Sequence, residues 1–180
     1  MKKKENKTLQ NTKNLALAAL FSALCFVLMY LGTVTMVLDL CAVTASALII
    51  ILAVIEIGGI YPWLIWAVTG VLCLLLLPDK YVALEFALYG GIYPMLKAFF
   101  ERFPKIIAWL FKLLYFNIAF TVSVFIAKYL LAVSDIGFEL KAVAYLCANA
   151  FFIISDICFS VMIGTYFRTI RPRLRLNRKK

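Results

Sequence analysis

Residues 14–32 read NLALAALFSALCFVLMYLG, and no charged side chain interrupts this run. At a helical rise of about 1.5 Å per residue, about 20 such residues cross the hydrocarbon core of a bilayer. The run is also longer than the apolar core of a secretory signal peptide, which spans roughly 7–15 residues. It therefore predicts a first membrane-spanning helix that stays in the mature protein.

The rest of the 180-residue chain extends the same composition. Hydrophobic residues make up 65% of the sequence and charged residues 16%, whereas soluble domains carry roughly a quarter charged residues. Twelve of the 19 basic residues lie in residues 1–13 and 168–180. A water-facing surface cannot be built from the segment between these tails. We therefore expect an integral membrane domain over residues 14–167, flanked by two basic tails.

Hydrophobic runs and breaking residues divide this domain into six expected helices. They cover residues 14–31, 38–57, 62–77, 81–100, 104–132 and 139–167. The fold class is thus an all-α bundle of six transmembrane helices. Gly58 and Gly59 join the second and third helices so tightly that these two could instead form a hairpin that does not fully cross. Gly90, Gly91 and Pro94 predict a kink or a broken helix within the fourth.

The distribution of basic residues predicts the topology. With six spans and both termini in the cytoplasm, fifteen Lys and Arg residues face the cytoplasm and three face outside, which is a strong positive-inside bias. This arrangement predicts a multi-pass protein of the plasma membrane. Basic tails next to apolar spans also suit membrane lipids as partners. A nucleic-acid partner is not expected, because such proteins spread basic residues over one folded face.

Two charged residues are expected inside the bilayer. Lys112 lies about 12 Å above the cytoplasmic end of the fifth helix, and Asp156 lies about 15 Å above that of the sixth. Opposite charges at similar depth on antiparallel helices predict an intramembrane ion pair. Alternatively, the Lys112 ammonium extends to the inner headgroups, and Asp156 bonds to a hydroxyl group such as that of Ser155 or Ser160.

Polar and tyrosine side chains nearer the outer surface could line a cavity that opens outward. Charged members of this set lie near the outer ends of the fourth, fifth and sixth helices, and the amides lie deeper. The candidates are Glu85, Tyr89, Asn117, Lys128, Lys141, Tyr145 and Asn149. The competing interpretation is that tyrosine side chains at interface depth anchor the bundle among the lipid headgroups.

The first helix carries small residues on one face. Ala16, Ala19 and Ala23 recur at positions i, i+3 and i+7, and small residues allow a second membrane helix to approach closely. The contacting helix could belong to another protein or to this same chain.

The basic tail, the run over residues 14–32 and the six-helix layout together resemble the substrate-binding S components of energy-coupling factor (ECF) transporters. The layout covers the whole chain, but the specific likeness is confined to residues 14–32. One departure lies in residues 56–62, EIGGIYP, which keep the glycines of the family's Gly-Pro-rich segment but rearrange them.

The resemblance implies a function without catalysis. An S component captures a vitamin or similar micronutrient from outside and docks on a transmembrane T subunit that is driven by two ATPase subunits. It implies a docking role for Ala19 and Ala23, with Ala16 as an extension. It also implies an outward pocket among the seven candidates and a gate over residues 32–38. No cofactor and no metal are implied.

Other functions fit the residues less well. A membrane scaffold protein of the rod-shape, cell-wall type would share the six-helix layout but would lack an outward pocket. A membrane enzyme is disfavoured because the chain has no histidine and no paired acidic motif. There is also no phosphate-binding G-x-x-x-x-G-K-[ST] motif, so transport energy would have to come from partner subunits. A lone secondary transporter would usually show an internal repeat.

Overall fold

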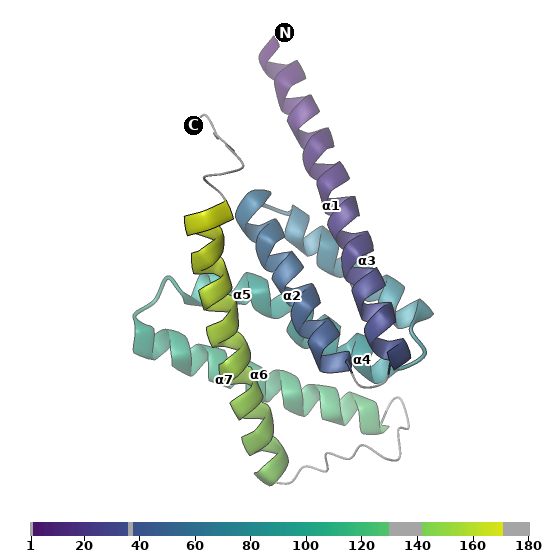
Figure 1. Cartoon of the computed structure of the whole chain (residues 1–180), viewed down its shortest axis with the longest axis vertical. Helices are drawn as coiled ribbons and strands as arrows, with labels where there is room; N and C mark the ends of the chain where they lie inside the picture. Colours follow the sequence, from purple (N-terminus) through teal and green to yellow (C-terminus); the bar gives the residue numbers. More distant parts are fainter. Residues whose placement is uncertain (1, 36–37, 130–141, 171–180) are drawn as a thin grey trace. The chain divides into compact units, whose positions relative to one another are not determined.

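The computed structural model describes residues 2–35, 38–129 and 142–170, and all of the secondary structure in this part of the chain is helical. The chain divides into two compact units, Met1–Gly137 and Phe138–Lys180, which are described separately. The first contains α1 (Lys2–Thr35), α2 (Asp39–Glu56), α3 (Tyr61–Leu76), α4 (Lys80–Glu85), η1 (Phe86–Gly91), α5 (Ile92–Phe100) and α6 (Lys105–Tyr129). The second contains α7 (Ala142–Thr165) and η2 (Tyr166–Ile170) (Figure 1).

Within the described residues, four helical segments are long and apolar enough to cross a membrane, as in an integral membrane protein. They are Leu9–Thr35, Asp39–Glu56, Lys105–Tyr129 and Val143–Thr169. Large apolar side chains such as Leu20, Leu110 and Ile154 are exposed on them, which suits a lipid surround. The third expected span is α3, whose 16 residues extend about 24 Å and are shorter than a typical hydrocarbon core of about 30 Å.

The first helix is longer than the sequence predicted. It begins at Lys2 and continues through Gly32 to Thr35, so residues 2–13, expected as a tail, are helical. Gly32 does not end the helix but allows a close approach of α2. A β-carbon on Gly32 would lie only 2.3 Å from the Cβ atom of Ala42.

One face of α1 packs on α2 and α3. Its buried side chains are Ala18, Ser22, Cys25, Met29 and Thr33, at helical spacing. The Cys25 thiol donates to the carbonyl oxygen of Ser46 in α2 at 3.7 Å, and the Ser46 hydroxyl donates back to the Cys25 carbonyl at 3.5 Å. Such small, mutually bonded residues bring the helix backbones close together.

The turn between α2 and α3 depends on two glycines. Gly58 and Gly59 both have a φ of 64°, a left-handed conformation that side chains with a β-carbon rarely adopt. The Gly58 N–H donates to the carbonyl oxygen of Ala53 at 3.0 Å and ends α2. The predicted helix boundaries on both sides of this turn are confirmed to within one residue.

The fourth expected helix is interrupted, as the sequence predicted. Lys80–Glu85 and Ile92–Phe100 are α-helical, and Phe86–Gly91 between them is a π-helical segment. Pro94 contributes to this irregularity because it has no N–H to donate to the carbonyl of Gly90, four residues earlier. Segments of this kind often accompany functional sites in helices.

Candidate functional site

Two neighbouring helices hold the π-helical segment η1 by its backbone. The indole Nε1–H of Trp66 in α3 donates to the carbonyl oxygen of Ala87 at 2.9 Å. The hydroxyl of Tyr115 in α6 donates to the carbonyl oxygen of Leu88. Side-chain donors from two sides therefore bind consecutive carbonyl groups of η1, and they fix its position between α3 and α6.

A row of tyrosine rings runs from η1 to α6. The ring of Tyr89 stacks on that of Tyr93 with 5.5 Å between centroids, and the ring of Tyr93 stacks on that of Tyr115 at 6.3 Å. Tyr89 also meets Phe116 edge-on at 5.8 Å. Of the pocket candidates, Tyr89 is thus buried in an aromatic cluster within the interrupted helix.

Acidic groups gather around Glu85, the last residue of α4. The Tyr81 hydroxyl hydrogen-bonds to the Glu85 carboxylate, and Asp39 and Asp79 lie within electrostatic range of it. Asp79 also caps α4, because its Oδ1 atom accepts from the Tyr81 N–H at 2.8 Å. Three carboxyl groups therefore lie close together at this end of the unit.

Sequence reasoning selected Glu85 as a candidate but did not select Asp39 or Asp79. Both precede or begin helices at connections that the predicted topology places on the outer side of the membrane. The sequence could therefore have indicated that both aspartates lie on the same side of the membrane as Glu85. It could not have indicated that they lie close to Glu85, because that depends on how α2 and α4 pack.

The next two pocket candidates, Asn117 and Lys128, belong to α6. The Asn117 amide donates to the carbonyl oxygen of Leu113 in its own helix at 2.8 Å. Lys128 is exposed near the end of α6, with its ammonium 5.9 Å from the ring centroid of Tyr129. The candidate Lys141 lies outside the described residues, as do positions 36 and 37 of the expected gate.

Two further candidates and the expected ion-pair acid belong to the second unit. The Asn149 amide donates to the carbonyl oxygen of Tyr145 one turn earlier at 2.8 Å. Asp156 is buried, and the Ser160 hydroxyl donates to its backbone carbonyl oxygen at 2.9 Å. That bond uses the Asp156 backbone rather than the carboxylate that the alternative interpretation invoked.

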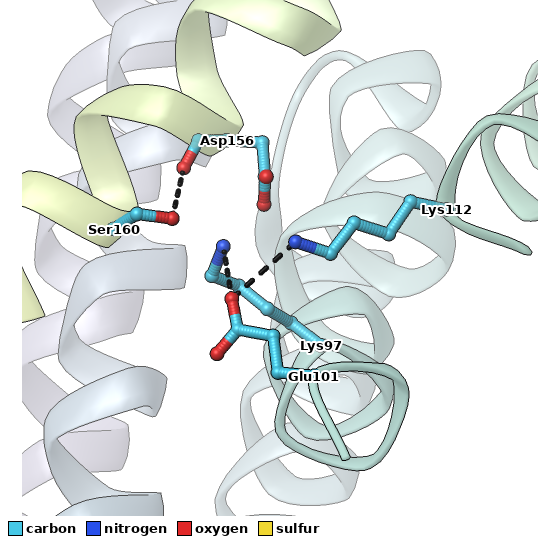
Figure 2. A network of polar contacts seen from close by, with 5 residues as sticks. All are labelled: Lys97, Glu101, Lys112, Asp156 and Ser160. Carbon is cyan, nitrogen blue, oxygen red and sulfur yellow. Dashed lines mark hydrogen bonds and ion pairs between the residues drawn. The ribbon is translucent and has the colours of Figure 1, made fainter. Parts of the chain in front are cut away.

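Two buried lysines share one carboxylate where α5 meets α6. The Lys97 ammonium lies 2.8 Å and the Lys112 ammonium 3.3 Å from Oε1 of Glu101, and Figure 2 shows both pointing toward this oxygen. Lys112 also lies 5.4 Å from the ring centroid of Trp109. The sequence identified Lys112 as an ion-pairing residue, but it missed Glu101 as a partner. The i, i+4 spacing of Lys97 and Glu101 was a usable signal.

The three alanines expected to form a docking face are all exposed. Ala16, Ala19 and Ala23 lie on the side of α1 away from the buried stripe that contains Ala18 and Ser22. Packing of α1 on α2 and α3 therefore leaves this small-residue face uncovered.

Comparisons with protein-family models, with curated proteins and with solved structures found no match for this chain.

Proposed function

We propose that this chain is the substrate-binding S component of an ECF-type importer. It captures a vitamin or similar micronutrient from outside and docks on a T subunit that carries two ATPase subunits. In this proposal the chain crosses the plasma membrane six times with both termini in the cytoplasm. The short helix α3 and the interrupted segment from α4 to α5 supply the third and fourth crossings.

The exposed alanine face of α1 carries the proposal. Ala16, Ala19 and Ala23 are exposed, so a second helix can approach the α1 backbone there. The resemblance of residues 14–32 to the first helix of S components suggests the proposed partner for this face, the T subunit.

The ligand is proposed to bind near η1. The aromatic cluster around Tyr89 provides ring surfaces, and the neighbouring carboxyl groups of Glu85, Asp39 and Asp79 provide hydrogen-bonding oxygen atoms. These groups favour a micronutrient that combines a ring with hydrogen-bond donors. Asn117, Lys128, Lys141, Tyr145 and Asn149 stay predictions from the sequence as further lining residues.

Co-purification tests the docking role. The tagged chain is expressed with candidate T and ATPase subunits, and the recovered proteins are identified by mass spectrometry. Ala19→Leu with Ala23→Leu should abolish recovery of the partners while the melting temperature stays unchanged. Ala67→Leu, at an exposed alanine of α3, is the matched control and should recover them normally.

Two outcomes would contradict the proposal. The first is that the double variant recovers the partners as well as the natural chain does. The second is that the natural chain purifies alone and no member of a vitamin panel raises its melting temperature. In that second case, a scaffold protein of the rod-shape type becomes the better interpretation.

A further inference from the structure

We propose that the turn between α5 and α6 binds the headgroup of an anionic phospholipid. The turn comprises the four residues Glu101 to Pro104 and is followed by Lys105, the first residue of α6. This inference requires only that the chain is a membrane protein, and it is independent of the proposed transport role.

An exposed aromatic cluster surrounds the turn. Phe99 and Phe103 are in contact with 5.5 Å between ring centroids, and Phe103 and Phe111 are in contact at 5.9 Å. These three side chains are 51%, 41% and 40% exposed. Their mutual contacts hold the rings in place on both sides of the turn, and exposed rings at a helix end suit the region where acyl chains meet headgroups.

Exposed positive charge lies beside these rings. Arg102 and Lys105 are both exposed, and they lie on either side of Phe103 and Pro104. The one acid of the turn, Glu101, is already engaged by the ammonium groups of Lys97 and Lys112. It therefore offsets the charge of Arg102 and Lys105 less than a free carboxylate would.

These two features together point to one kind of ligand. A guanidinium group binds phosphate through two parallel hydrogen bonds, and a nearby ammonium adds charge attraction. The phenylalanine rings next to them provide an apolar surface for the acyl chains of the same molecule. A phospholipid with a net negative headgroup meets both demands, whereas a free phosphate ion uses only the charges.

Lipid binding can be measured on the purified full chain in non-ionic detergent. Native mass spectrometry would compare phosphatidylglycerol with phosphatidylcholine of the same acyl chains. The natural chain should bind the anionic lipid roughly thirtyfold more tightly, as expected for two basic residues near a headgroup that contribute about 1 kcal/mol each. Arg102→Gln with Lys105→Gln should remove most of this preference.

Control variants separate a local site from overall charge. Lys13→Gln with Arg168→Gln removes the same formal charge at two exposed positions on other helices, and it should keep the preference. Phe99→Ala with Phe103→Ala should weaken binding of both lipids. Thermal unfolding of each variant verifies that it is folded.

The proposal is overturned if the Arg102 and Lys105 double variant keeps the same lipid preference as the Lys13 and Arg168 control. It is also overturned if inorganic phosphate at millimolar concentration stabilises the protein as well as phosphatidylglycerol does, because the site would then recognise a free anion.

Discussion

The indole of Trp66 covers Gly91 so closely that a β-carbon on Gly91 would lie 2.0 Å from the Cδ1 atom of Trp66. The same indole donates its Nε1–H to the carbonyl oxygen of Ala87. One side chain of α3 thus fixes both the start and the end of the π-helical segment. Because that segment carries Tyr89 and follows Glu85, the contact between Trp66 and Gly91 positions the proposed ligand site.

Gly91→Ala should destabilise the protein by about 1–3 kcal/mol, as overpacking of a tight contact does. The rigid indole is bonded to Ala87 and cannot yield easily. Gly70→Ala is the matched control, because a β-carbon there meets nothing within 4 Å and alanine favours a helix over glycine. Thermal unfolding in detergent measures both, and equal melting temperatures for the two variants would contradict the packing described.

A second prediction concerns the contact between α1 and α2. Gly32→Ala should destabilise the protein because its new methyl group would collide with the Ala42 Cβ atom at 2.3 Å. Adding Ala42→Gly removes the obstructing methyl group and should restore most of the lost stability. A double variant that melts no higher than Gly32→Ala alone would mean that the two positions are not in contact.

A third prediction tests the shared carboxylate. Glu101→Gln should lower the free energy of unfolding by about 1.5 kcal/mol, since hydrogen bonds to charged groups contribute about this much and the side chain of Glu101 is half-exposed. Lys97→Met should then be less destabilising in the Glu101→Gln background than in the natural chain. Additive effects in this double-mutant cycle would show that Lys97 and Glu101 do not interact.

The ion pair of Lys112 with Asp156 stays a prediction from the sequence. If it forms, Lys112→Asp and Asp156→Lys should each destabilise the chain, and the double variant should recover part of the loss. Recovery will be incomplete, because Lys112 also pairs with Glu101. Expression level and melting temperature measure the effect. The pair would be ruled out if both single variants expressed and melted like the natural chain while the double variant did not fold.

A further prediction addresses the proposed ligand site. If a micronutrient donates hydrogen bonds to both oxygen atoms of the Glu85 carboxyl group, Glu85→Gln should weaken its binding about tenfold, because the amide nitrogen cannot accept and leaves a donor unsatisfied. Ligand-induced shifts of the melting temperature measure this. Glu101→Gln is the control, because it removes an acid elsewhere in the chain, and it should leave the ligand-induced shift of the melting temperature unchanged. If both variants reduce this shift equally, Glu85 has no specific role in binding the ligand.

Helix positions could be predicted from the sequence where local signals are strong. Gly58 and Gly59 fixed the turn after α2, and Pro94 together with Gly90 and Gly91 indicated the break in the fourth helix. These features depend on backbone conformation alone. The first helix was predicted too short because its charged amino-terminal residues were assigned to a tail, although nothing in residues 2–13 prevents a helix.

The contacts that build the candidate site could not be predicted in the same way. The bonds from Trp66 to Ala87 and from Tyr115 to Leu88 depend on the rotation of α3 and α6 about their axes. An all-round apolar helix gives no clear periodicity from which that rotation can be read. The partnership of Glu101 with Lys112 likewise depends on the path of the turn between α5 and α6.

The length of α1 has a mechanical consequence. Its 34 residues form a rod about 51 Å long, whereas the hydrocarbon core is about 30 Å thick. In the proposed topology, the lysine-rich end of this rod extends into the cytoplasm as a lever arm that is continuous with the packed part of the unit. A tilt of the unit by about 10° would swing the amino end by about 9 Å on this geometry, so a spectroscopic label there would report reorientation of the unit in the membrane.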